Sequence, residues 1–122
     1  MRELLDLFTY ASPPAGDDLA RIRYEASIQP GFHESFAAMF PAPRQRWIDS
    51  VVTPDSALQT LPHPTLVIHG REDRIIPLSN ALHLMRHIPD VRLHVFGQCG
   101  HWTQIEHSQE FNRLVLEFLA DG

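Results

Sequence analysis

The amino-acid sequence predicts an α/β fold in which a helical segment precedes a parallel sheet with flanking helices. Two short apolar runs, at residues 65–69 and 91–96, have the composition of buried strands. An amphipathic helical pattern follows each of them, at residues 78–88 and 107–120. Because strands that alternate with helices form parallel sheets with right-handed crossovers, these observations together predict the fold class.

The first half of the chain, residues 1–60, contains only short helical patterns that proline interrupts. We expect the first helix to end at residues 12–16 and Asp17 to cap the next one. The remaining helical patterns cover residues 18–28, 32–40, 46–52 and 54–61. Four aromatic side chains of this half would either line a substrate channel or belong to the core: Phe32, Phe36, Phe40 and Trp47.

The second half of the chain supplies the strands and the two longer helices. The run at residues 65–69 lies between Pro64 and Gly70, as expected for a strand that is buried on both faces. The helix at residues 78–88 would turn four apolar side chains inward, namely Leu82, Leu84, Met85 and Ile88. The last helix would bury a similar face, made of Phe111, Leu114, Val115, Phe118 and Leu119.

Composition and charge are those of an ordinary soluble globular chain, with 43% apolar and 20% charged residues. The 122 residues include 10 basic and 15 acidic ones, and no basic stripe indicates nucleic acid as a partner. The apolar runs are too short to span a bilayer, and the acidic start is unlike a signal peptide. The single cysteine, Cys99, suits a reducing compartment. We therefore expect a cytoplasmic protein with no membrane partner.

The number of predicted strands is small for a parallel sheet. Such a sheet is covered on both faces and usually contains several strands, whereas this sequence provides two. We therefore expect the chain to be the C-terminal portion of a larger fold, whose missing N-terminal half is its partner. The exposed sheet edge also favours a homo-oligomer or a swapped assembly.

Asp73 and His101 each follow one of the predicted strands, where functional groups gather in an open parallel sheet. Adjacent strands lie about 5 Å apart, so the two loops can meet. A carboxylate that holds an imidazole in one tautomer forms the general-base half of a nucleophilic catalytic system. Asp73 alone could instead serve only to form a turn. Gly100 would let the backbone turn sharply before the histidine.

The motifs around these two residues resemble a known family. H-G-x-x-D-x-x-x-P at residues 69–77, followed by G-H at residues 100–101 and a closing helix, is similar to the α/β-hydrolase fold. The fuller segments V-I-H-G-R-E-D-R-I-I-P and F-G-Q-C-G-H-W-T-Q-I-E-H resemble the meta-cleavage-product hydrolases, which cut a C–C bond in ring-fission products of catechols. The resemblance is greatest to the subgroup that acts on 2-hydroxymuconic semialdehyde. It implies a helical lid at residues 1–45 and the C-terminal part of the hydrolase core at residues 46–122.

The resemblance also implies roles for individual residues. His101 would be the catalytic base and Asp73 the acid that orients it. Arg23, in the run R-Y-E-A-S, matches a lid arginine that polarises a dienoate substrate, and Trp102 matches an active-site tryptophan beside the histidine. Hydrolysis would release 2-hydroxypenta-2,4-dienoate and a small acid, with no metal or organic cofactor.

The sequence departs from the family pattern at the nucleophile. The family uses a serine in a G-x-S-x-G turn after an earlier strand, and no such motif occurs in this sequence. Cys99 is two residues from His101, a spacing that does not favour contact between their side chains. We therefore assign Cys99 to the substrate-binding side of the pocket, as a small buried residue.

Two functions of different classes follow from this departure. The first is part of a C–C hydrolase, with an esterase of the same fold as the nearest enzymatic alternative. The second is a non-catalytic fragment that needs the missing half. Because losing a triad serine costs about 10⁶-fold in rate, we expect the isolated chain to be inactive.

His83 and His87 are the remaining candidates for chemistry. They lie four residues apart on one predicted helix, which is the spacing of a metal chelate. No nearby carboxylate or cysteine in the sequence completes a ligand set. A solvated helical face is therefore the expected interpretation, and we assign no metal ligand.

Overall fold

The computed structural model describes residues 2–11 and 16–121. Its helical first half comprises α1 (Arg2–Phe8), α2 (Gly16–Ser27), α3 (Phe32–Met39), α4 (Gln45–Ser50) and α5 (Asp55–Leu58). The second half comprises β1 (Thr65–Gly70), α6 (Leu78–His87), β2 (Val91–Phe96), α7 (Thr103–Glu106) and α8 (Ser108–Ala120). The predicted order of helices and strands is therefore confirmed. Most of the turn expected at residues 12–16 lies outside the described residues.

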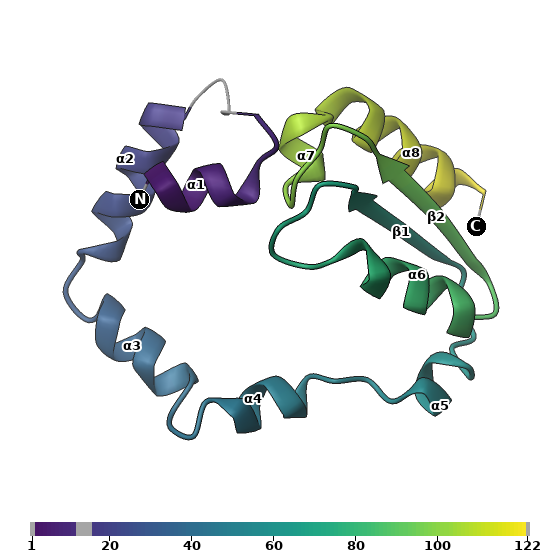
Figure 1. Cartoon of the computed structure of the whole chain (residues 1–122), viewed down its shortest axis with the longest axis horizontal. Helices are drawn as coiled ribbons and strands as arrows, with labels where there is room; N and C mark the ends of the chain where they lie inside the picture. The colour runs from purple at the N-terminus through teal and green to yellow at the C-terminus, as the bar shows by residue number, and fades with distance from the viewer. Residues whose placement is uncertain (1, 12–15, 122) are drawn as a thin grey trace.

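The two strands form a parallel sheet whose register runs from Thr65 opposite Val91 to Gly70 opposite Phe96. Helix α6 covers one face of this sheet and α8 lies on the other (Figure 1). The α/β class and the parallel pairing are thus confirmed. Because the strands end in register, the loops that follow Gly70 and Phe96 begin at the same edge of the sheet.

Most element boundaries differ from the prediction by one or two residues, and α5, predicted at residues 54–61, covers only Asp55–Leu58. Asp17 lies in the first turn of α2, which already begins at Gly16, so it does not cap the helix as expected. The predicted helix at 107–120 begins at Ser108 instead, with His107 as the residue before it. The four-residue helix α7 precedes it and was not predicted. A single helical turn is too short to show an apolar period in the sequence.

The buried apolar core is small. Among the described residues its members are Leu5, Ala81, Ile88, Phe96, Cys99 and Trp102. Three side chains that were predicted to face inward, Leu82, Met85 and Leu119, are exposed instead. A sheet of two strands covers only a narrow stripe of each flanking helix, so apolar side chains beside that stripe remain in solvent.

Helices α1 to α5 form an arc that leaves the sheet region near α7 and returns to it near α6 (Figure 1). Phe32, Phe36 and Phe40 are exposed and Trp47 is half-buried, so none of the four belongs to the buried core. Phe36 stacks near both Phe32 and Phe40, at ring-centroid distances of 6.4 and 5.5 Å. Phe36, Phe40 and Trp47 line an open apolar hollow between α3 and α4.

Among residues 2–11 and 16–121, no helix has both the length and the apolar character required to cross a membrane.

Candidate active site

The structure brings Asp73 and His101 together at the carboxyl ends of the two strands. Asp73 lies in the loop after β1, and His101 lies in the loop between β2 and α7. His101 Nδ1 is 2.9 Å from Asp73 Oδ2, which is the distance of a charge-assisted hydrogen bond. The Asp73 side chain is 4% exposed and the His101 side chain 27%. The carboxylate is therefore enclosed, whereas the imidazole still reaches solvent.

The two oxygens of Asp73 have different partners. Oδ1 accepts hydrogen bonds from the backbone N–H groups of Ile75 and Ile76, at 2.8 and 2.9 Å. Oδ2 contacts His101. Burial alone would raise the pKa of Asp73, but the hydrogen bonds from Ile76, His101 and Ile75 outweigh it and hold this pKa below its ordinary value. Asp73 therefore both forms the turn and supplies an ionised partner for the imidazole.

The contacts of His101 assign its tautomer. An ionised carboxylate only accepts hydrogen bonds, so Nδ1 carries the proton that it donates to Asp73. Nε2 is then left with its lone pair, as a general base requires. The neighbouring His69 contacts the Ile76 carbonyl oxygen with its Nε2 at 3.0 Å, as expected for a residue that bonds backbone.

The loop that carries His101 is attached to helix α1. The backbone N–H groups of His101 and Trp102 both donate to the carbonyl oxygen of Phe8, at 2.8 and 3.3 Å. A Cβ atom on Gly100 would lie 2.8 Å from that same oxygen, so glycine is required for the close approach. The residue of this loop with a positive φ is Gln98, at 55°, and the sharp turn expected at Gly100 stays a prediction.

Two carboxylates that sequence reasoning missed hold this loop in place. Glu72 Oε2 accepts a hydrogen bond from the N–H of Cys99 at 3.1 Å, and this bond is the main reason that the pKa of Glu72 is lowered. Glu106 Oε1 accepts from the N–H of Gly100 at 2.6 Å, while Oε2 accepts from the N–H of Tyr10, also at 2.6 Å. Glu106 therefore joins the histidine loop to the segment after α1. Its place in the motif G-H-W-T-Q-I-E is the only sequence signal for this role.

Comparison with known proteins agrees with this arrangement. Residues 10–108 match the family model described as alpha/beta hydrolase fold. The chain belongs to the α/β-hydrolase fold family. Over all 122 residues it is 61% identical to a 2-hydroxymuconate semialdehyde hydrolase of Pseudomonas sp. (strain CF600). It is 52% identical over 120 residues to a 2-hydroxy-6-oxo-2,4-heptadienoate hydrolase of Pseudomonas putida.

Solved structures of hydrolases give the same result in three dimensions. A meta-cleavage product hydrolase from Pseudomonas fluorescens IP01 superposes with a TM-score of 0.92 at 60% identity, over 99% of this chain and 44% of its own. A 2-hydroxy-6-oxo-6-phenylhexa-2,4-dienoate hydrolase from Rhodococcus sp. strain RHA1 superposes with a TM-score of 0.87 at 32% identity. The superposition covers 98% of this chain and 43% of the Rhodococcus chain. The chain spans 43% of the length of the Pseudomonas sp. relative and corresponds to its C-terminal portion.

Arg23 and Trp102, the two residues assigned to substrate binding by resemblance, lie against each other in this chain. The guanidinium carbon of Arg23 is 4.9 Å from the Trp102 ring centroid, within the range of a cation–π contact. Phe8 stacks on the same indole at 4.8 Å and also lies 5.4 Å from the His101 ring. Phe8 is thus a further residue of the site that the sequence did not indicate. The arrangement places the cationic side chain of Arg23 beside the residue that follows His101, while its role in binding stays a prediction.

Cys99 is fully buried at 0% exposure, as expected for a small residue behind the pocket. Its Sγ lies 3.7 Å from both the Gly100 carbonyl oxygen and Glu106 Oε1. Burial, together with the nearby charge of Glu106, raises the pKa of this thiol to about 12. The thiol therefore stays protonated and does not replace the serine nucleophile. Its assignment to substrate binding stays a prediction, one that complete burial does not favour.

The expectation that no carboxylate lies near His83 and His87 is wrong. Asp55, at the start of α5, contacts both imidazoles. It precedes His83 by 28 residues, so no local pattern in the sequence indicates the contact. The fold creates this group by returning the end of the helical arc to α6 (Figure 1).

Proposed function

We propose that this chain supplies the acid–base pair and the lid of a C–C bond hydrolase that acts on ring-fission products of the 2-hydroxymuconic semialdehyde type. The 2.9 Å contact between His101 and Asp73 carries the proposal, because it orients the imidazole for base catalysis. Support comes from the relatives at 61% and 52% identity, both of which are hydrolases of dienoate semialdehydes or ketones by name.

In the proposed reaction, His101 Nε2 removes a proton from a serine hydroxyl of the rest of the core, or from water. The activated oxygen attacks the carbonyl carbon beside the C–C bond that breaks, and Asp73 stabilises the imidazolium ion that forms. The leaving carbon takes up a proton as the dienoate departs. Overall, one water is consumed: its hydroxyl joins the acyl fragment and its proton the dienoate.

Arg23 and Trp102 hold the substrate in this proposal. A dienoate carries a carboxylate, and the Arg23 guanidinium is a permanently charged group that pairs with carboxylates. Its position over the Trp102 ring restricts it to the side of the lid near His101. Substrate polarisation by Arg23 would precede attack by the activated oxygen.

The partner in this proposal is the remainder of the hydrolase core. It would contribute the serine, the oxyanion hole and the strands that extend the sheet beyond β1, and would cover the apolar hollow of the arc. The lid at residues 1–45 and the core portion at residues 46–122 are then two parts of one enzyme of the cytoplasm. Without that remainder, a homo-oligomer or swapped assembly would cover the same apolar surface.

A chimera tests the proposed function directly. This chain would replace the matching C-terminal portion of the Pseudomonas sp. hydrolase, and turnover would be followed by the loss of absorbance of yellow 2-hydroxymuconic semialdehyde. We expect turnover by the chimera and none by the 122-residue chain alone. His101→Ala should reduce the rate of the chimera by about 10⁴- to 10⁶-fold, as for other triad members.

A matched control separates catalysis from folding. His63→Ala removes an exposed histidine from the segment between α5 and β1 and should leave turnover within about twofold of the parent, as surface changes do. Equal rates for the His101→Ala chimera and its parent would contradict the assignment of the base. Hydrolysis of p-nitrophenyl acetate without cleavage of the dienoate would favour the esterase alternative.

A further inference from the structure

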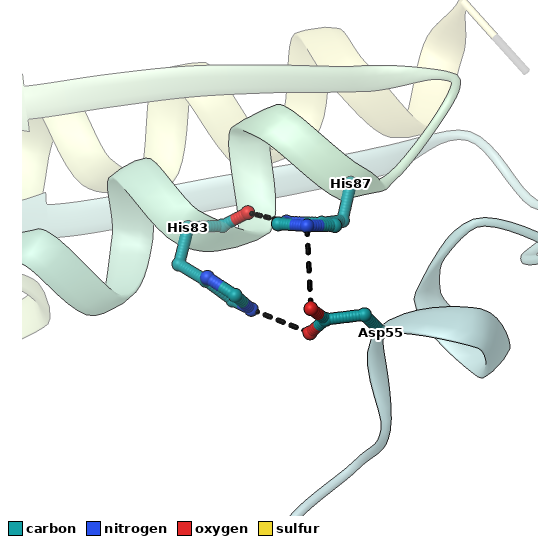
Figure 2. A group of neighbouring side chains, drawn as sticks. All are labelled: Asp55, His83 and His87. Atoms are coloured by element: carbon teal, nitrogen blue, oxygen red, sulfur yellow. Dashed lines mark hydrogen bonds and ion pairs between the residues drawn. The ribbon is translucent and has the colours of Figure 1, made fainter.

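A second cluster of polar side chains lies on the outer side of α6, apart from the acid–base pair. His83 and His87 are one turn apart on this helix, and Asp55 reaches them from α5 (Figure 2). His83 Nε2 is 2.8 Å from Asp55 Oδ1, and His87 Nε2 is 3.4 Å from Asp55 Oδ2. The ligand atoms of all three residues lie within 4.8 Å of one another. Two imidazoles and a carboxylate therefore converge on one point.

The orientation of His87 is fixed by its own helix. Its Nδ1 lies 2.8 Å from the carbonyl oxygen of His83, which only accepts hydrogen bonds, so Nδ1 carries the proton (Figure 2). In the neutral imidazole, Nε2 then has the lone pair that a metal ion would take, on the side of Asp55. Metal-binding histidines characteristically donate their other ring N–H to a carbonyl or carboxylate in this way. The His87 side chain is 23% exposed, so the ring is partly held by packing.

We propose that Asp55, His83 and His87 bind a divalent transition cation of the zinc type. Zinc takes imidazole nitrogens and carboxylate oxygens at about 2.0–2.2 Å, so donors around one ion lie roughly 3.3 Å apart in a tetrahedral arrangement. The observed spacing of 3.4 Å between His87 and Asp55 is close to this value, and the 2.8 Å hydrogen-bond contact of His83 with Asp55 would lengthen as the ion replaces the proton. Two nitrogen donors favour zinc, nickel or copper over magnesium and calcium, which prefer oxygen. Water would occupy the fourth position.

The position of the cluster separates this site from the proposed catalytic centre. Helix α6 runs antiparallel to the strands, so its last turn lies at the opposite end of the sheet from Asp73 and His101 (Figure 1). The cation would join α5 to α6 and thereby fix the end of the helical arc against the sheet layer. Its role is therefore structural, independent of the hydrolase reaction.

Asp55 could also serve only as the counter-ion of two histidines, with no metal. The two possibilities differ in a direct measurement of Zn²⁺ binding to the complete 122-residue chain by isothermal titration calorimetry. We expect one Zn²⁺ per chain, with binding unchanged by millimolar Mg²⁺. Asp55→Asn and His83→Gln should each weaken the affinity by roughly tenfold or more, since even substitutions behind the ligands cost 10–100-fold.

Two controls and one measurement on the unaltered chain complete the test. His63→Gln removes an exposed histidine outside the cluster, and His101→Gln removes the catalytic candidate; both should keep the parent affinity. Zn²⁺ should also shift the imidazole NMR signals of His83 and His87 before those of the other histidines, which requires no variant. Absence of saturable binding, or an equal loss of affinity in the control variants, would overturn the proposal.

Discussion

In α2 to α4 of the helical arc, most large apolar side chains stay exposed, whereas the unit from β1 to α8 buries part of its own. Two isoleucines illustrate the contrast: Ile48 in α4 is 59% exposed, and Ile88 at the end of α6 is 6% exposed. Ile48 lies within α4, and Ile88 directly follows α6. The difference arises because α6 packs on a sheet, while α3 and α4 lie away from it (Figure 1).

The arc nevertheless contacts the sheet unit at each of its ends. At one end, the carbonyl oxygen of Phe8 accepts hydrogen bonds from the histidine loop, and Glu106 bonds the N–H of Tyr10. At the other end, Asp55 contacts the histidines of α6. Polar contacts therefore position both ends of the arc, with Leu5 and Phe8 adding apolar contact at the first end, whereas apolar burial holds the sheet unit together. Mutations of the two kinds should therefore have different consequences.

The largest effect is expected from Gly70→Ala, in the sheet unit. A Cβ atom on Gly70 would lie 1.9 Å from the Gly100 carbonyl oxygen and 2.5 Å from that of Cys99. Both neighbours are backbone atoms, so the overlap is relieved only by separating the two loops that bring Asp73 and His101 together. We expect the free energy of unfolding to fall by about 3 kcal/mol or more, as measured by urea denaturation followed by circular dichroism.

Gly97→Ala is the matched control for this prediction. A Cβ atom there would meet only the guanidinium of Arg71, at an ordinary 3.5 Å. Its effect should therefore remain within about 0.5 kcal/mol, as for other surface changes. If the two alanine variants unfolded at the same urea concentration, the close packing of the two loops would not be a source of stability.

An intermediate effect is expected from truncating one isoleucine in each region. Ile88→Ala removes a buried side chain and should lower the free energy of unfolding by about 2–4 kcal/mol. Ile48→Ala removes an exposed one and should change it by less than about 0.5 kcal/mol. The same urea experiment measures both. Similar losses would show that the hollow beside α4 is covered in solution, for instance by a second copy of the chain.

The sequence predicted most of what local pattern and topology control. The strand at residues 91–96 has the predicted bounds, because a short apolar run between polar turns defines it. Asp73 and His101 could be placed together since both follow parallel neighbouring strands. By contrast, the contacts of Asp55 with α6 and of Glu106 with Tyr10 join segments that are far apart in the chain. No local sequence pattern predicts such contacts. The exposure of Met85 could not be foreseen because it depends on how wide the sheet is.

The smallest effect concerns the acid dependence of stability, which also separates the two regions. In the folded chain the pKa of Asp73 lies below its ordinary value of 3.8. At pH values between the folded-state pKa and the ordinary pKa, the unfolded state therefore binds more protons than the folded state. The contribution of Asp73 is thus fully present above pH 4 and is lost as the pH falls through the folded-state pKa. Asp73→Asn should flatten the fall in stability between about pH 4 and pH 2, measured by urea denaturation at each pH. The matched control is Asp49→Asn, which removes an exposed carboxylate of α4 instead. An equal change of slope in both variants would mean that the acid dependence does not arise from the enclosed contact with His101.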